Sequence, residues 1–434
     1  MGRAGGLLRS FETTALAIER ACRSKKTMPM ASQAYERHLA DVAVIGGGLT
    51  GILAALRLAR AGARVVLVDR PLPQANARIG GFARFSGAKF SLPPAGMGLA
   101  PVAGSESRLS ETIHEVLHVL RLNPGDALSS TDGVSPANSG LTLRQYDSIV
   151  LTPAEIEQLL DRLTSQLASS AELVRGTATR LIRNGADWQV DVQPSDARAN
   201  EFQVVAKAVF FAAGRLSDDI LLAAGAIPNE GKGLDIGVRL EFLQRDALSG
   251  LRRHGPDAKF MWETCRTFCL NSPGIIYRYP FQSIMLPGGV VAGEDTPAAN
   301  VGLLLRVPDK QVRLSRIMEN AAPLASELIA ESDLIRVGEL QPLPRSVGAL
   351  FGEDAANQLS EFCHLLHAHQ LLDLNREHRV HLPLLDWHWN TYAQAASHRT
   401  SLDRVYALGD SSGHARGLLQ AAVSGWLAAE EYLC

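Results

Sequence analysis

Asp41-Val-Ala-Val-Ile-Gly46-Gly-Gly-Leu-Thr-Gly51 is the stretch that decides the fold, together with Ala63-Arg-Val-Val-Leu-Val-Asp69 shortly after it. A short apolar run, a glycine cluster, an Ala/Leu-rich helical segment over 52–61 and a second β-branched run are the parts of a βαβ unit. The stretch therefore predicts two parallel strands joined by a helix.

The glycines of this unit are spaced as Gly46-x-Gly48-x-x-Gly51. Gly46 permits a tight turn, Gly48 lets a pyrophosphate approach the backbone, and Gly51 lets the helix pack closely on the strand. Asp69 closes the second strand 21 residues after Gly48, where a carboxylate accepts hydrogen bonds from a ribose. A glycine-rich turn without a ligand would leave Asp69 unexplained. The predicted dinucleotide site consists of Gly46, Gly48, Leu49, Thr50, Gly51, Asp69 and Arg70.

The composition narrows the class of protein further. The 434 residues contain 43 Lys and Arg against 45 Asp and Glu, and 46% of them are hydrophobic, so we expect two or three folding units. The near-neutral balance gives no global attraction to nucleic acid or to an anionic membrane, and we expect neither partner. Five scattered cysteines without a CxxC pair indicate a reducing, cytoplasmic compartment. No apolar run approaches the roughly 18–20 residues of a membrane span, so we expect a soluble chain.

A second signal lies near the other end of the chain. Arg404-Val-Tyr-Ala-Leu-Gly-Asp410 is typical of a buried strand, and 418–433 is helical in character. The sheet that begins at Asp41 thus closes only near the C-terminus, which favours FAD over NAD. On these residues the sequence resembles the two-dinucleotide-binding-domain flavoproteins. The resemblance implies that Gly409 and Asp410 hold the flavin ribitol and that the backbone amides of Gly417, Leu418 and Leu419 stabilise negative charge on the reduced ring.

Further segments resemble a narrower family, the largely uncharacterised FAD-dependent dehydrogenases often described as NAD-utilising. These segments are Gly80-Gly-Phe-Ala-Arg-Phe-Ser-Gly-Ala-Lys-Phe90, Ala212-Ala-Gly-Arg215, Asp235-Ile-Gly-Val-Arg-Leu-Glu241 and 299–307. With the two FAD motifs, the resemblance spans about residues 40–430. It implies further cofactor contacts by Gly81, Arg84, Phe85, Ser86, Thr179, Ala213 and Gly214.

The predicted fold class is α/β, with a Rossmann-like FAD-binding domain and a second α+β substrate or cap domain inserted into it. We assign residues 39–224 and 396–434 to the discontinuous FAD-binding domain and residues 225–395 to the inserted domain. Residues 1–38 are expected to be disordered or to result from a mis-annotated start, with a transit peptide as the alternative.

Three side chains are candidates for catalysis. Arg84 and Lys89 lie in the loop expected beside the isoalloxazine, where Lys89 is suited to favour reduced flavin or to bind a substrate carboxylate. A solvated loop lysine is the alternative. Arg278 falls in a strand of the inserted domain, where an arginine can clamp a carboxylate, and a surface ion pair is the alternative. The histidines crowded into 364–389 lack metal-ligand spacing, so we expect no metal.

The sequence therefore predicts an oxidoreductase that transfers a hydride between a small organic substrate and non-covalently bound FAD. Two alternatives stay open from the sequence: a flavin-dependent monooxygenase acting on a small molecule, and an FAD-bearing RNA-modifying or interaction protein. Residues 220–400 contain no second glycine fingerprint between a strand and a helix, so a permanent NAD(P)H site is not expected. The sequence determines neither the substrate nor the oligomeric state.

Overall fold

A computed structural model describes residues 36–70, 78–85, 88–129, 139–215, 219–231, 233–329, 334–335 and 343–434. Almost all of the expected N-terminal extension over 1–38, and the predicted flavin contact Ser86, lie outside the described residues. Two sheets, each with its own helices, belong to the same unit, Arg37–Cys434.

The first sheet contains the βαβ unit that the glycine-rich stretch predicts. Its strands are β1 (Glu36–Ile45), β2 (Val65–Asp69), β6 (Glu172–Asn184), β7 (Asp187–Pro194), β8 (Phe202–Phe211) and β17 (Val405–Ala407). β1 pairs in parallel with β2, β2 with β6, and β8 with β17, and β1 also pairs with β8. β7 links β6 and β8 in antiparallel fashion. The strands predicted near the two ends of the chain are therefore members of one sheet.

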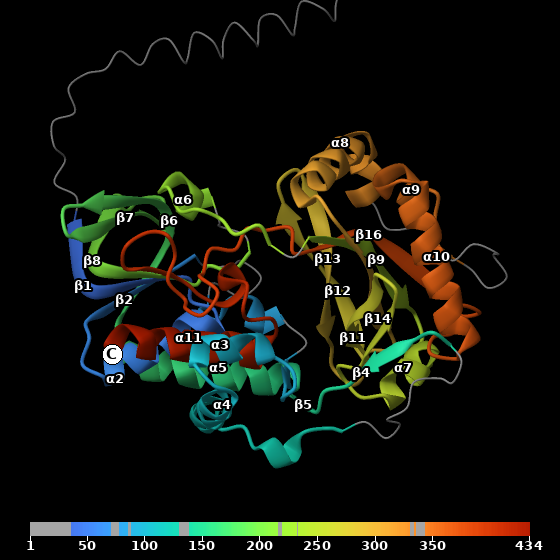
Figure 1. Ribbon diagram of the computed structural model, residues 1–434, viewed down its shortest axis with the longest axis horizontal. Coiled ribbons are helices and arrows are strands. Elements are labelled where there is room, and N and C mark those ends of the chain that lie inside the picture. Colours follow the sequence, from blue (N-terminus) through green and yellow to red (C-terminus); the bar gives the residue numbers. More distant parts are fainter. Residues whose placement is uncertain are drawn as a thin grey trace, which may run out of the picture. The chain divides into compact units, whose positions relative to one another are not determined.

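Helices cover one face of this sheet (Figure 1). They are α2 (Leu49–Arg60), α4 (Glu106–Leu120), α5 (Pro153–Ala168) and α11 (Leu418–Leu433). α5 begins as the sequence predicts, because Thr152 and Glu155 form a reciprocal capping box and Pro153 occupies the first turn. On the other face of the sheet, side chains of β1, β2, β6, β7 and β8 share a second core with α6 (Asp219–Ala223). This sheet with its covering helices is the Rossmann-like domain of the prediction.

The second sheet has the order β15-β16-β9-β14-β11-β10-β4. These strands are β4 (Thr142–Arg144), β9 (Leu234–Phe242), β10 (Lys259–Trp262), β11 (Cys265–Asn271), β14 (Ala299–Val307), β15 (Leu334–Ile335) and β16 (His378–Asp386). α8 (Lys310–Ile329), α9 (Ser346–Phe351) and α10 (Glu353–Ala368) share a hydrophobic core with it. β12 (Gly274–Phe281) and β13 (Ile284–Val291) form a separate antiparallel ribbon. Short elements complete the description: β3 (Lys89–Ser91), β5 (Ser148–Val150), α3 (Ala100–Ala103) and α7 (Ser249–Arg253).

The structure differs from the expected domain boundaries at two places. β4 falls within the predicted FAD-binding residues, yet it pairs with β10 in the second sheet. Tyr392 and Ala393, expected in the inserted domain, are buried in the core of the first sheet. Neither departure leaves a sequence signal, because β4 is only three residues long and the contacts of 392–393 are made with distant parts of the chain.

Candidate functional site

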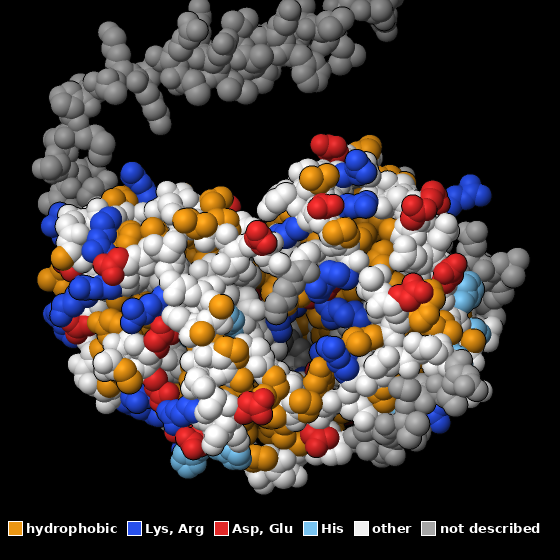
Figure 2. Space-filling model, viewed as in Figure 1, with side chains coloured by type: hydrophobic (Ala, Val, Ile, Leu, Met, Phe, Trp, Pro, Cys, Tyr) orange, Lys and Arg blue, Asp and Glu red, His pale blue; other side chains and the backbone are white. Residues whose placement is uncertain are grey.

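A central cavity of about 690 Å³ lies where the strand ends of the first sheet meet the second sheet. Figure 2 shows this face of the molecule hollowed, with Lys and Arg side chains along the hollow. The predicted site residues that line the central cavity are Gly46, Gly48, Leu49, Thr50, Asp69, Arg70, Gly81, Lys89, Ala213, Gly214, Asp410, Gly417 and Leu418. Residues from both ends of the chain thus meet around one space.

The glycine-rich turn forms an open cradle at the start of α2. Gly46 has φ +105°, and a Cβ on Gly51 would lie 1.9 Å from the Gly46 carbonyl oxygen, so both positions require glycine. A Cβ on Gly48, by contrast, would meet nothing within 4 Å. Gly48 is also the N-cap of α2, which has no side-chain cap. The first amides of α2 are therefore available to an anion, and Gly48 leaves space for it to approach.

Asp69 stands at the end of β2 beside this cradle. Its carboxylate accepts a hydrogen bond of 2.7 Å from the Gly47 amide. Burial raises the pKa of Asp69 to about 6, although the Gly47 amide and the charges of Arg70 and Arg175 act in the opposite direction. The carboxylate lines the central cavity and keeps acceptor capacity for ribose hydroxyls.

The other end of the cavity is formed by the turn before α11. Gly417, with φ +106°, is the N-cap of α11 and has no side-chain cap, so the first amides of this helix are available too. The Gly409 amide donates to the Ser424 hydroxyl at 3.0 Å, which fixes the turn that carries Asp410. Two helix N-termini therefore face one cavity, each suited to negative charge.

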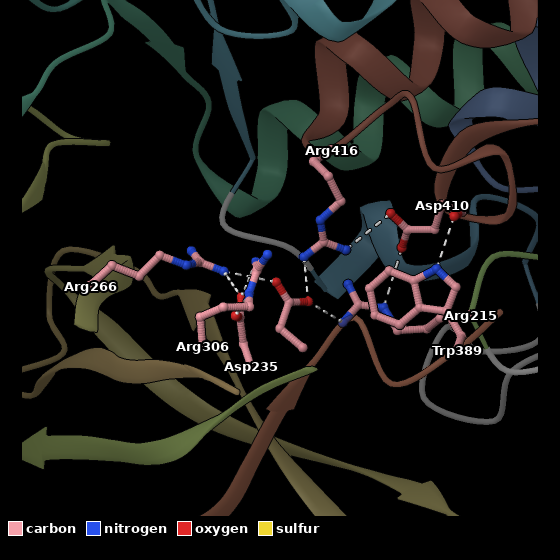
Figure 3. A network of polar contacts seen from close by, with 8 residues as sticks. Arg215, Asp235, Arg266, Arg306, Trp389, Asp410 and Arg416 are labelled. Atoms are coloured by element: carbon pink, nitrogen blue, oxygen red, sulfur yellow. Dashed lines mark hydrogen bonds and ion pairs between the residues drawn. The ribbon is translucent and has the colours of Figure 1, made fainter. Parts of the chain in front are cut away.

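Asp410 belongs to a polar network that joins the two sheets (Figure 3). Arg215 Nε and Arg416 Nη1 donate to its carboxylate, each at 3.2 Å, and Trp389 Nε1 donates to its carbonyl oxygen at 2.9 Å. Both guanidinium groups lie 4.8 Å from the centre of the Trp389 ring. Each arginine is thus held by a charge-assisted hydrogen bond and by a cation–π contact with Trp389, and together the two arginines fix Asp410 at the cavity wall.

Asp386 continues the network into the second sheet. It is buried, and it accepts from Arg416 Nη2 at 2.5 Å and from Arg266 Nη2 at 3.1 Å. Burial alone would raise the pKa of Asp386, but Arg416, Arg215 and Arg266 outweigh it and hold the pKa at about 2. Asp386 is therefore ionised at neutral pH and ties the two parts of the site together.

Residues 41–176 match the family model described as FAD dependent oxidoreductase. This segment of the chain is similar to FAD-dependent oxidoreductases. The residues present fit this cofactor, because the space at Gly48, the carboxylate of Asp69 and the turn at Asp410 open into one cavity. When bound, FAD supplies a ring that exchanges an electron pair with a substrate.

Solved structures show remote likenesses to this chain. The L-proline dehydrogenase from P. horikoshii is 19% identical at a TM-score of 0.23, with 42% of this chain and 24% of that chain covered. The OxyS anhydrotetracycline hydroxylase from Streptomyces rimosus is 16% identical at a TM-score of 0.41, with 91% of this chain and 63% of that chain covered. The p-nitrophenol 4-monooxygenase PnpA from Pseudomonas putida DLL-E4 is 15% identical at 0.43, with 92% and 79% covered. The chain thus spans about a quarter of the length of the proline dehydrogenase and less than two thirds of the length of the OxyS hydroxylase. The sequence has no significant match among curated proteins.

Arg84 is not where the sequence predicts it. Its side chain is buried, Nε donates to the Ile79 carbonyl at 2.6 Å, and Nη2 donates to Asp161 of α5 at 2.6 Å. It is absent from the described lining of the central cavity. Arg84 therefore fastens the 79–85 loop to α5, and the expected contact with flavin or substrate is wrong for this side chain.

Arg278 also makes its contacts elsewhere. Its Nη2 lies 3.0 Å from His381 Nδ1, and His381 Nε2 lies 2.9 Å from a Glu241 carboxylate oxygen. The three side chains connect β12, β16 and β9, and Arg278 is not among the described residues that line the cavity. The expected carboxylate clamp is therefore not formed at Arg278.

Other predicted contacts shape the site without lining it. The Phe85 ring stacks on Tyr277 with centroids 5.2 Å apart. The Thr179 hydroxyl donates to the Asp191 carbonyl, and the preceding residues 176–178 line the cavity instead. The Leu419 side chain is fully buried in the core of the first sheet. These positions lie beside residues that line the cavity, and their own contacts with the cofactor stay predictions.

Lys89 is the one catalytic candidate that the described structure places at the cavity. Its ammonium donates to the Leu270 carbonyl, and burial lowers its pKa. The neighbouring Cys269 also lines the cavity and has φ +46°, a backbone conformation that non-glycine residues seldom adopt. Lys89 therefore links β3 to β11 at the cavity wall.

The sequence did not indicate the charged wall that the second sheet contributes. Arg144, Lys259, Arg266 and Arg306 line the cavity from four different strands. Arg266 and Arg306 had one available signal, since each is a charged residue within a largely apolar strand. Nothing in the sequence indicated that these strands would face the FAD-binding residues.

Proposed function

We propose that this protein is an FAD-dependent oxidoreductase that transfers a hydride between a small organic substrate and non-covalently bound FAD. One observation carries the proposal: a single cavity reaches from the dinucleotide cradle at Gly48 to a wall built by the second sheet. A cofactor held at the first end leaves the second wall to a substrate, which is the usual position of such sites between domains.

The proposed division of labour follows the two sheets. β1, β2, β6, β8 and β17 with their helices form the FAD-binding domain, and the sheet of β9, β14 and β16 forms the substrate domain. The cradle amides and Gly48 bind the pyrophosphate, Asp69 accepts from the ribose, and Asp410 accepts from the ribitol. The N-terminus of α11 and the guanidinium of Arg416 favour negative charge on the adjoining part of the cofactor.

We further propose that electrons come directly from the organic substrate or from a nicotinamide that visits only transiently. The absence of a second glycine fingerprint from residues 220–400 supports this proposal. Anaerobic stopped-flow reduction by NADH and NADPH tests it. We expect slow reduction that does not saturate, and fast, saturable reduction with tight nicotinamide binding would refute it.

The decisive experiment is an anaerobic screen of small organic reductants against the purified yellow protein. We expect at least one class of compound to bleach the oxidised flavin, and acid precipitation to release intact FAD into the supernatant. A folded but colourless protein that cannot be reconstituted with FAD would refute the proposal. Hydroxylated product formed with consumption of oxygen would favour a monooxygenase, and copurifying RNA would favour a macromolecular partner.

Among the described residues, no helix combines the length and the apolar character that crossing a bilayer requires. The cytoplasmic location expected from the cysteine pattern stays a prediction.

A further inference from the structure

The wall that the second sheet gives to the central cavity carries more cations than carboxylates. Arg144, Lys259, Arg266 and Arg306 line it together with Asp257 and Asp386. In Figure 2 the Lys and Arg side chains gather along the hollow of the molecule. The cofactor phosphates do not account for these cations, because the phosphates belong to the cradle in the first sheet.

The carboxylates of this wall are already shared among several cations. Asp235, behind the wall, accepts from both Arg266 and Arg306. Asp386 accepts from Arg266 and also from Arg416 of the first-sheet side. The Asp257 carboxylate lies 3.6 Å from Lys259 Nζ and also accepts a hydrogen bond from the Ser91 hydroxyl. The existing pairs therefore do not neutralise the wall.

Two arginines keep unused hydrogen-bonding capacity at this wall. The hydrogen bonds of Arg266 to described residues all come from Nη2, which leaves Nε and Nη1 without such a bond. Its guanidinium lies 5.1 Å from the centre of the Phe268 ring, which holds the plane of the group. Arg144 forms no ion pair with the described residues. A planar fork fixed on an aromatic ring is suited to binding a carboxylate through two hydrogen bonds.

The rest of the wall favours an organic anion over a free inorganic one. Met261 and Phe268 line the cavity beside Arg266, and the lining as a whole offers apolar surface. An inorganic phosphate would leave that surface in water, whereas an organic acid would cover it. The cations thus suit the carboxylate of an organic acid, and the apolar side chains suit its hydrocarbon part.

We propose that this wall, centred on Arg266 and completed by Arg144 and Lys259, binds the carboxylate of an organic acid substrate. The proposal rests on the proposed function and names the substrate class of the same site. The residues differ from those that the sequence predicts for carboxylate binding. Arg278 lies outside the wall, and the Lys89 ammonium already donates to the Leu270 carbonyl.

The test is calorimetric titration of the FAD-loaded protein with benzoate, benzamide and inorganic phosphate. Benzoate and benzamide have nearly the same shape and differ in charge. We expect benzoate to bind at least about tenfold more tightly than benzamide, and more tightly than phosphate, with an affinity that falls as ionic strength rises.

Variants assign the binding to the wall. We expect Arg266→Gln to weaken benzoate binding about tenfold, Arg144→Gln about threefold, and Arg266→Lys by an intermediate factor because it keeps the charge and loses the fork. Arg245→Gln is the matched control, since Arg245 pairs with Glu294 at the surface and is not among the residues that line the cavity. Its benzoate affinity should stay within about twofold of wild type.

Equal affinity for benzoate and benzamide, or equal loss in the Arg245 control, would overturn the proposal. If Arg266→Gln fails to fold, Arg144→Gln and Arg266→Lys decide it, because both leave the pairs of Asp386 with Arg416 intact. Flavin reduction without benzoate binding would refute this inference alone. Benzoate binding without reduction by any organic compound would instead refute the proposed function.

Discussion

The change of Gly48 to alanine separates the role of the cradle in folding from its role in binding. Gly48 has φ −70° and ψ 177°, a conformation that alanine adopts without strain, and the added Cβ would meet nothing within 4 Å. The stability of the FAD-free protein should therefore change by less than about 0.5 kcal/mol. The methyl group would, however, occupy the space through which a pyrophosphate approaches the amides of α2.

The expected loss of affinity follows from the hydrogen bonds at that end of the helix. If the methyl group holds the phosphates away from two backbone amides, two charge-assisted bonds of about 1.5 kcal/mol each are lost. The sum of about 3 kcal/mol corresponds to a dissociation constant for FAD weakened roughly 150-fold. The assay is fluorescence titration of the FAD-free protein with FAD, alongside urea unfolding without FAD.

The change of Gly51 to alanine is the contrasting control. Its Cβ would lie 1.9 Å from the Gly46 carbonyl oxygen, so α2 and the end of β1 would have to separate by roughly 1 Å. We expect this variant to lose about 1–3 kcal/mol of stability even without FAD. Wild-type FAD affinity in the Gly48 variant, or equal destabilisation of both variants, would refute the assignment of Gly48 to the pyrophosphate.

Three further predictions test the charged groups of the site and its support. Because the pKa of Asp69 is raised to about 6 and ribose hydroxyls favour the ionised acceptor, FAD affinity should increase as pH rises from 5 to 7. In the same titration, Asp69→Asn should bind FAD more weakly and show no such pH dependence. Arg84→Ala should lower the free energy of urea unfolding by about 2–3 kcal/mol yet leave the rate of flavin reduction unchanged, and a large fall in that rate would restore the sequence expectation. Burial would raise the pKa of Glu431, but its bonds from His398 and Ser397 hold it at about 2, so the stability it contributes should be lost as pH falls from about 4.5 towards 2; acid unfolding of Glu431→Gln should lack that part of the loss.

The sequence was most informative where the chain's own local chemistry defines the structure. The cradle was predictable because Gly46 and Gly51 are required by the local geometry of a strand, turn and helix, and Gly48 keeps the approach to that helix open. The start of α5 was predictable because Thr152 and Glu155 cap it within four residues. The helix over 418–433 was predicted at its observed limits from the helical character of its own residues, since α11 has no side-chain cap.

Side chains whose role depends on partners from distant parts of the chain were placed less well. Arg84 looked like a cofactor contact because it lies in a loop beside the site, and only the position of Asp161 on α5 draws it into the protein. The charged wall of Arg144, Lys259 and Arg266 was missed altogether. Its residues come from three short strands that hydrogen-bond side by side, and strand pairing of this kind leaves no local pattern.

The sequence by itself determined that the chain binds a dinucleotide, because the glycine spacing and Asp69 act within one βαβ unit of adjacent residues. Only the tertiary structure decided what faces that dinucleotide. It places Asp386 of β16 between Arg416 and Arg266, although these residues lie far apart in the chain. Such a network forms because burial makes unpaired charges costly, so each charged group must find partners wherever the fold brings them within reach.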